Sequence, residues 1–242
     1  MMCVVSLMSK CRILAVDTAT EACSAALYVD GEIQQQYELA PREHTQLILQ
    51  MIEALLAEAE LSMKQLDALA FGCGPGSFTG VRIATGVIQG IGFAADLPVV
   101  PVSTLASIAQ VVFEDHAAQK VLSAIDARMG GVYWSEYLLA DNGLMQLSGV
   151  EDVLTPDVTP IVEGDDWVAA GSGWKGHAEI LQPRFEKNIQ HLYDNILPQS
   201  RTIAKLAAFA YQKGEAVEAK YAVPVYLRNN VAKKSVDQNR KA

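Results

Sequence analysis

The sequence predicts an α/β protein made of two similar lobes, each a mixed sheet with helices on its faces. Apolar strand patterns alternate with amphipathic helical patterns along the chain, which is typical of the α/β class. The segment ILAVDTATEACSAALYVDG also has a counterpart, LSAIDARMGGVYWSEYLLADNG, with the same order of strand, aspartate, small-residue loop, second strand and turn. The two segments share few residues, so two unrelated β-hairpins remain an alternative to an internal repeat.

Composition limits the classes of protein that the chain can belong to. Its 242 residues are 50% hydrophobic and 19% charged, enough for a buried core in one or two domains. The net charge of −9 opposes binding of the whole surface to nucleic acid. Four cysteines without a CxxC pair favour a reducing compartment. No apolar run reaches the ~18 residues of a membrane span, so we expect a cytoplasmic protein.

The first half of the chain begins with a tail at residues 1–10. Strands are expected at 13–16 and 22–29, where Asp30-Gly31 makes a hairpin turn, and at 32–39. Pro41 suits the first turn before a helix over 43–61, and Ser62 with Gln65 predicts a capping box. A strand at 69–72 then leads into the glycine-rich segment GCGPGSFTGVR.

The later elements follow from caps and periodicity. The sequence predicts a helix at 79–95, a strand at 99–102, and a helix capped by Ser103 that runs to Phe113. Further on it predicts a strand at 167–170, a helix at 173–181, and a helix capped by Ser200 and ended by Gly214, before the extended segment VPVYLR. We therefore divide the chain into a lobe at 11–102, a lobe at 103–227 whose helix 201–213 packs back on the first lobe, and a basic tail at 228–242.

Six segments carry a resemblance to a known family. They are ILAVDTATEACSAAL, REHTQLILQMI, FGCGPGSFTGVRIATG, VPVSTLASIA, IDARMGGVYW and PVYLR. In this order and spacing the chain resembles the TsaB family, also called YeaZ, over nearly all of residues 11–234. The resemblance implies the ribonuclease H-like fold of actin, sugar kinases and heat-shock ATPases. It also implies a non-catalytic subunit that binds TsaD, which transfers a threonylcarbamoyl group to the adenosine next to the anticodon in tRNA, together with the ATPase TsaE.

The sequence differs from the catalytic relative TsaD at two positions that bind metal in TsaD. In TsaD, the helix that follows a strand resembling VVPV bears two metal-binding histidines four residues apart, so that both face one ion. The same pattern places Thr104 and Ile108 at those positions. We therefore expect no metal and no cofactor of the chain's own, with ATP and metal belonging to the partner subunits.

The glycine-rich loop has two interpretations. It lacks the lysine of a P-loop, yet backbone amides at a helix N-terminus can bind an anion. The possible nucleotide or anion contacts are Asp17, Gly74, Gly76 and Ser77. The favoured alternative is that Asp17 only caps its own hairpin turn, and that Gly76, Gly80, Gly86 and Gly90 let another backbone approach the helix closely.

The helix predicted at 43–61 has an apolar arc of about 200°, wider than the ~100° that packing on one sheet requires. Its second face either lies under the second lobe or binds a partner, TsaD or another copy of the chain. The residues expected on this partner surface are Arg42, His44, Leu47, Ile48, Met51, Leu55, Gly80, Ala84, Val87 and Gly90. Leu47 and Met51 are predicted to form the edge toward the partner, and Ile52 and Leu56 the edge toward the core.

The predicted function is a scaffold that holds and activates TsaD in the complex, reaches tRNA only through it, and forms a homodimer when alone. One alternative is an independent enzyme, either an ATPase or kinase of the same fold or a metallopeptidase. The missing lysine and histidines count against both. The other alternative is a homodimeric resuscitation-type factor.

Overall fold

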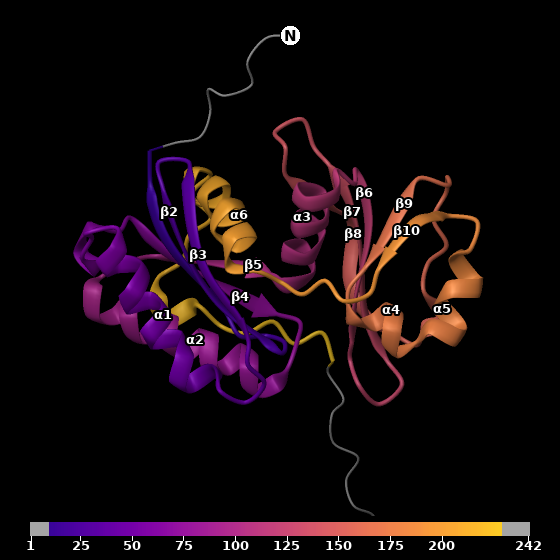
Figure 1. The fold of residues 1–242 in the computed structure, drawn as a ribbon, viewed down its shortest axis with the longest axis horizontal. Helices are drawn as coiled ribbons and strands as arrows, with labels where there is room; N and C mark the ends of the chain where they lie inside the picture. The colour runs from indigo at the N-terminus through magenta and orange to yellow at the C-terminus, as the bar shows by residue number, and fades with distance from the viewer. Residues whose placement is uncertain (1–9, 229–242) are drawn as a thin grey trace, which may run out of the picture.

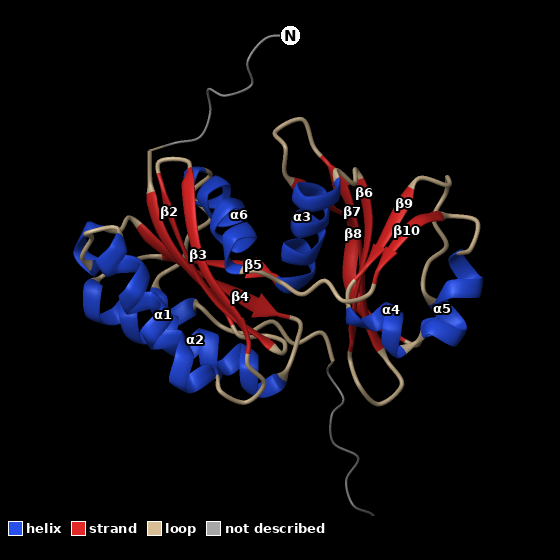
Figure 2. Ribbon diagram, in the orientation of Figure 1, coloured by secondary structure: helices blue, strands red, loops and turns tan. Residues whose placement is uncertain are grey.

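The protein is described by a computed structural model, in which residues 10–228 are placed (Figure 1). Most of the two predicted tails, at 1–10 and 228–242, lies outside the described residues. The described chain forms two sheets side by side, each flanked by helices, as Figure 2 shows.

The first sheet has the strand order β3-β2-β1-β4-β5. Its strands are β1 (Arg12–Asp17), β2 (Ala22–Val29), β3 (Glu32–Leu39), β4 (Ala68–Gly74) and β5 (Val99–Ser103). Strand β2 runs antiparallel to its neighbours β1 and β3, whereas β1, β4 and β5 run parallel to one another. Strands β1, β2 and β4 are buried almost throughout, because helices cover both faces of the sheet.

The second sheet repeats this arrangement, with the order β10-β9-β6-β7-β8. Its strands are β6 (Lys120–Asp126), β7 (Val132–Leu139), β8 (Met145–Leu154), β9 (Trp167–Ala170) and β10 (Ile189–Tyr193). Strands β6, β7 and β8 are antiparallel, and β6, β9 and β10 are parallel. Each strand thus matches one of the first sheet in place and direction. The predicted fold of two similar lobes is confirmed, since two unrelated hairpins would not share a five-strand order.

Helices fill three layers around the sheets (Figure 1). Helices α1 (His44–Glu58) and α2 (Phe78–Ala95) cover the outer face of the first sheet, and α6 (Ser200–Gln212) covers its inner face. Helix α3 (Thr104–His116) packs on the second sheet next to α6, and α4 (Ser172–Gly176) and α5 (Ala178–Phe185) lie on that sheet's other face. Three 3-10 turns complete the chain: η1 (Met63–Gln65), η2 (Pro156–Val158) and η3 (Ala219–Tyr221).

Caps set several of these boundaries. The Ser103 hydroxyl accepts from the backbone N–H groups of Leu105 and Ala106 at the start of α3, as predicted. Ser62 and Gln65 form the predicted capping box at η1. Gly214, with φ of +76°, follows the end of α6.

The structure differs from the sequence predictions in three places. The helix expected at 173–181 is two short helices, α4 and α5, which meet at His177. Strands β8 and β10 were not predicted, because edge strands that are largely exposed lack a clear apolar alternation. Ser200 is not a cap. Its hydroxyl instead donates to the Ser24 carbonyl on β2 at 2.8 Å, which fixes the start of α6 on the first sheet.

The end of the chain returns to the first lobe. Ile203, Ala204 and Ala207 of α6 pack against β1, β2 and β4. Val217 then pairs with Val99 at the edge of the same sheet. Residues 200–222 therefore belong structurally to the first lobe, and the second lobe ends before the predicted residue 227.

Polar contacts between α3 and α6 join the lobes. Arg201 donates to Glu114 at 2.7 Å and to Asp115 at 2.8 Å, and Lys205 donates to Glu114 at 2.8 Å. Beneath them, the hydroxyls of Ser107 and Thr202 lie 2.8 Å apart. These partly buried ion pairs and the buried hydroxyl pair hold the two sheets in one arrangement, because α3 packs on one sheet and α6 on the other.

By length and composition alone, α2 is apolar enough to cross a membrane. However, Val81, Ala84 and Ile88 on this helix are buried against the first sheet. That packing is what a core helix of a folded lobe requires.

Two glycines of α2 lie in opposite environments and provide a test of the packing. A Cβ atom at Gly80 would overlap the Thr18 carbonyl oxygen, whereas one at Gly90 would meet nothing within 4 Å. We expect Gly80→Ala to lower the free energy of unfolding by about 1–3 kcal/mol, and Gly90→Ala to raise it by about 1 kcal/mol through helix propensity. Urea unfolding of both variants measures this, and shifts in the same direction would contradict the packing described.

Candidate functional site

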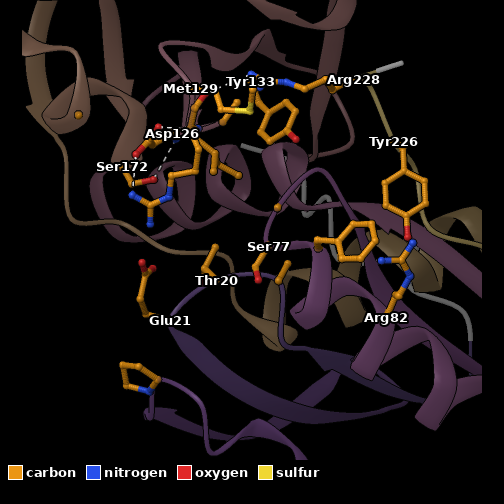
Figure 3. Close-up of a pocket in the computed structure, with 18 of the residues that line it drawn as sticks. Thr20, Glu21, Ser77, Arg82, Asp126, Met129, Tyr133, Ser172, Tyr226 and Arg228 are labelled. Carbon is orange, nitrogen blue, oxygen red and sulfur yellow. Dashed lines mark hydrogen bonds and ion pairs between the residues drawn. The ribbon is translucent and has the colours of Figure 1, made fainter. Parts of the chain in front are cut away.

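A cleft of about 910 Å³ lies between the lobes (Figure 3). On the first lobe its walls come from the β1–β2 loop, from Pro41 to His44, and from the start of α2. On the second lobe they come from the β6–β7 loop and from α4, and the C-terminal segment adds Tyr226 and Arg228. The cleft thus lies where the two matching strand–loop–strand units face each other.

Asp17 does not reach this cleft. It ends β1, is completely buried, and its Oδ1 accepts from the backbone N–H of Ala19 at 3.1 Å, which caps the hairpin turn. Its Oδ2 has no hydrogen-bond partner among residues 10–228, and the absence of a side chain at Gly72 leaves room for it. Burial raises the pKa of Asp17 to about 7. The favoured interpretation, a cap of its own turn, agrees with this geometry, and a nucleotide contact does not.

The glycine-rich loop packs against the protein's own backbone. The Ser77 N–H donates to the Ala19 carbonyl at 2.7 Å, and the Thr18 hydroxyl donates to the Gly80 carbonyl at 2.6 Å. A Cβ atom at Gly76 would lie 2.5 Å from the Ala19 carbonyl oxygen. The Ser77 hydroxyl accepts from Gly80 N–H and so caps α2. Glycine is needed at positions 76 and 80 for this close approach, in agreement with the packing interpretation.

The other predicted anion contacts divide between the cleft and the interior. Gly76 and Ser77 line the cleft, but Gly74 lies beneath the C-terminal segment, where the Val225 N–H donates to the Cys73 carbonyl at 2.8 Å. Gly74 is therefore not an anion contact in this structure. Burial also raises the pKa of the Cys73 thiol to about 12, so this cysteine is a buried filler rather than a reactive thiol.

Thr104 and Ile108, at the two positions where we expected no metal ligand, are buried inside the protein. Thr104 is fully buried and its hydroxyl donates to the Pro75 carbonyl. Ile108 is fully buried in the core between α3 and the second sheet. Within residues 10–228, no cluster of three or more His, Cys, Asp or Glu side chains could hold a metal ion.

Asp126 is the second-lobe counterpart of Asp17, and it does line the cleft. Its carboxylate accepts from the Arg128 backbone N–H at 2.8 Å and from the Arg128 guanidinium at 3.0 Å. His177 Nε2 lies 3.7 Å away and contacts the Gly131 carbonyl at 3.0 Å. The sequence repeat pointed to Asp126 as the equivalent of Asp17, but only the structure shows that the two carboxylates have different exposure.

Sequence reasoning did not bring together the basic residues of the cleft, and it placed one of them, Arg42, on the partner surface. Arg42, Arg82, Arg128, Lys175 and Arg228 line the cleft. They come from five separate segments, so no local charge run could have revealed them.

The predicted partner surface divides into buried and accessible residues. Ile48, Leu55 and Ala84 are fully or almost fully buried under the two helices, and Gly80 is buried against Thr18. These residues support the helices from within and are not available to a partner. Leu47 and Val87 are half-buried, and Gly90 and Arg42 are exposed.

The proposed division of α1 into two edges is not observed. Met51 is 6% exposed, like Leu56 at 7%, and both belong to one core cluster with Ile52. Met51 is therefore a core residue, and only Leu47 of the predicted partner edge remains accessible. The alternative that the helix lies under the second lobe is also excluded, because α1 lies on the outer face of the first sheet (Figure 1).

His44 supports the cleft wall rather than the partner surface. Its ring is mostly buried, and Nε2 contacts the Thr20 carbonyl at 2.9 Å. Arg42, two residues earlier, has a φ of 73° and projects from the turn into the cleft lining. The first residue of α1 thus fixes the β1–β2 loop.

The fold and cleft define a class of two-lobed α/β proteins built from a duplicated five-stranded unit. A family model described as "TsaD: tRNA N6-adenosine threonylcarbamoyltransferase" matches residues 31–236. The tRNA threonylcarbamoyladenosine biosynthesis protein TsaB of Escherichia coli is 44% identical over 93% of this chain and 98% of its own length. TsaB of Haemophilus influenzae is 42% identical over 95% of this chain and 98% of its own.

A solved structure gives the same result. YeaZ from Pseudomonas aeruginosa superposes with a TM-score of 0.84 and 46% identity, covering 90% of this chain and all of that one. The chain belongs to the TsaB family of tRNA threonylcarbamoyladenosine biosynthesis proteins. The family resemblance and fold expected from the sequence are confirmed.

The buried carboxyl of Asp17 predicts a pH-dependent stability. Because its folded-state pKa of about 7 is raised above the ordinary 3.8, the folded protein holds this proton more tightly than the unfolded chain. Its contribution is therefore fully present below about pH 4 and is lost as the pH rises to about 7. We expect the free energy of unfolding of the wild type, relative to Asp17→Asn, to fall by up to about 4 kcal/mol between pH 4 and 8.

Denaturant unfolding across this pH range measures the difference. Asp141→Asn, at an exposed turn, controls for the loss of one carboxylate. A wild-type curve parallel to that of Asp17→Asn would show that Asp17 does not titrate in this range.

Proposed function

We propose that this chain is a non-catalytic subunit that binds and activates the catalytic subunit TsaD for threonylcarbamoylation of tRNA, within a cytoplasmic complex that also contains the ATPase TsaE. ATP and metal belong to the partner subunits in this proposal. When the partner is absent, two copies of the chain pair through the same surface. The proposed binding surface is the outer side of α1 and α2, defined by Leu47, Ile83, Gly86, Val87, Gly90 and Phe93 and called here the α1–α2 face.

One observation carries this proposal. Gly86 and Gly90 are exposed on α2, and a Cβ atom at either would contact nothing within 4 Å. Each glycine costs the helix about 1 kcal/mol relative to alanine. No contact among the described residues offsets this cost, in contrast to Gly76 and Gly80. A second backbone packed against α2 would offset it, because glycine permits the closest approach of another helix.

The surrounding residues support the same surface. Phe93 is 87% exposed, while Leu47, Ile83 and Val87 are half-buried against the core. At 100° per residue, Gly86, Gly90 and Phe93 lie within about 60° of one another around α2, so the exposed ring and the two glycines share one face of the helix. A stable interface buries about 1,200–2,000 Å² in total, which a pair of helices from each partner can supply.

The geometry also supports a non-catalytic role. The resemblance places Thr104 and Ile108 at the metal-binding positions of TsaD. Both side chains are fully buried and pack inside the protein. An independent ATPase or kinase of this fold would need a carboxylate at the end of β1 that reaches the cleft, whereas Asp17 is sealed from it. The chain's contribution to the reaction is then architectural or allosteric, through the partner's arrangement.

The substitution Gly90→Arg tests this surface. Because the position is open and arginine favours a helix more than glycine does, we expect the variant to fold and to melt at or slightly above the wild-type temperature. Its bulk would prevent close approach of the partner, weakening association with TsaD at least about 100-fold and lowering the rate of tRNA modification in parallel. Analytical ultracentrifugation and isothermal titration calorimetry with purified TsaD measure the association.

The matched control is Gln182→Arg, which adds the same side chain at an exposed position of α5 in the second lobe. It should bind TsaD normally. A folded Gly90→Arg variant that binds TsaD as tightly as this control would place the interface elsewhere.

A further inference from the structure

The interlobe cleft has a charge opposite to that of the whole protein. The chain carries 28 acidic and 19 basic residues, yet among residues 10–228 the cleft is lined by five basic side chains and two carboxylates, Glu21 and Asp126. One of these carboxylates, Asp126, already pairs with Arg128. A concave surface with this charge concentrates anions even on a protein with a negative net charge.

Exposed aromatic rings accompany these cations at the mouth of the cleft. Phe78 is 64% exposed and Tyr226 is 45% exposed. The Arg82 guanidinium lies 3.2 Å from the ring centroid of Phe78 and 5.2 Å from that of Tyr226, next to which it appears in Figure 3. Flat guanidinium and aromatic groups beside a basic groove are the surfaces on which unpaired nucleic acid bases stack.

The opposite wall presents a strained turn. Arg128 and Met129, between β6 and β7, have φ values of 59° and 53°, in the left-handed region that non-glycine residues rarely adopt. Both side chains are exposed, and both line the cleft. A backbone conformation that costs of order 1–3 kcal/mol per residue is typical of binding sites.

The sequence that follows the last cleft residue is also rich in basic residues. Arg228 lines the cleft, and its guanidinium donates to the Arg128 carbonyl at 3.1 Å. The sequence that follows, NNVAKKSVDQNRKA, contains four basic residues and one acidic residue. The last described residue thus joins the cleft to the most basic segment of the chain.

The site does not have the parts that a metal-bound nucleoside triphosphate needs. Asp17 is sealed behind the sheet, the Ser77 N–H is bonded to Ala19, and the Ser77 hydroxyl caps its own helix. What the cleft offers instead is cations on both walls, Arg42 and Arg82 on one lobe and Arg128 and Lys175 on the other. Cations on two facing walls can neutralise several phosphates of a nucleic acid strand.

From these observations we propose that the interlobe cleft binds a single-stranded segment of RNA, with Arg82 and Arg128 contacting phosphates and Phe78 and Tyr226 stacking on bases. The proposal rests on the role in tRNA modification proposed above, but concerns a different surface from the α1–α2 face. It gives this chain a direct part in holding the RNA substrate. The RNA binds at the cleft while the partner occupies the outer helices.

The test measures binding of a fluorescein-labelled single-stranded oligoribonucleotide, of about ten nucleotides, by anisotropy at about 50 mM salt. We expect the purified chain alone to bind it with a dissociation constant on the order of 1–100 µM. The double variant Arg82→Glu with Arg128→Glu should bind at least about tenfold more weakly. Its slope of log affinity against log salt should be smaller by about 1.4, since each lost phosphate contact on a single strand contributes about 0.7.

Two further variants separate this effect from general causes. Lys64→Glu with Lys187→Glu makes the same change in net charge at exposed positions outside the cleft, and should bind RNA like the wild type at 50 mM salt. Phe78→Ala with Tyr226→Ala should weaken binding about tenfold while leaving the salt slope unchanged, because stacking releases no counterions.

Three results would overturn the proposal. One is a wild-type chain that does not bind the oligoribonucleotide. Another is a cleft variant that binds it as tightly as the Lys64 and Lys187 control. The third is tighter binding of ATP than of RNA, lost in the cleft variant, which would make the cleft a nucleotide site. None of these measurements uses TsaD, so they fail or succeed independently of the α1–α2 face.

Discussion

The contact between the glycine-rich loop and the β1–β2 turn is the constraint on which the first lobe depends. The carbonyl oxygens of Thr18 and Ala19 lie where side chains at Gly80 and Gly76 would be, and hydrogen bonds join the two segments on both sides. The same approach leaves Asp17 enclosed behind Gly72. A loop that binds phosphate in other architectures is here used to fix α2 against the sheet.

That use has consequences for the site. Because Asp17 cannot reach the cleft, only the second lobe contributes a strand-end carboxylate to it, and Arg128 partly neutralises this group. The cleft is therefore basic, although both halves of the fold are built on the same plan. The two lobes share one plan, but the strand-end carboxylate is buried in the first lobe, at Asp17, and lines the cleft in the second, at Asp126.

A second constraint is the polar contact between the lobes. Arg201 and Lys205 on α6 pair with Glu114 and Asp115 on α3, and a buried hydroxyl contact lies beneath them. Glu114 accepts from both Arg201 and Lys205, so more than one side chain of α6 is tied to the same carboxylate on α3. These contacts between the lobes agree with the proposed role of a subunit that supplies a binding surface to a partner.

The sequence alone determined the class of the protein, the duplicated fold, the caps at Ser62 and Ser103, and the packing role of Gly76 and Gly80. These depend on local chemistry or on patterns repeated within one element. It could not determine which apolar residues of α1 stay accessible, since Met51 and Leu47 differ only through the neighbours that cover them. It also missed the edge strands β8 and β10 of the second sheet, although it predicted that the helix at 201–213 packs back on the first lobe. Only the tertiary structure brought Arg42, Arg82, Arg128, Lys175 and Arg228 to one cleft, because their proximity arises from the packing of two lobes and leaves no trace in sequence spacing.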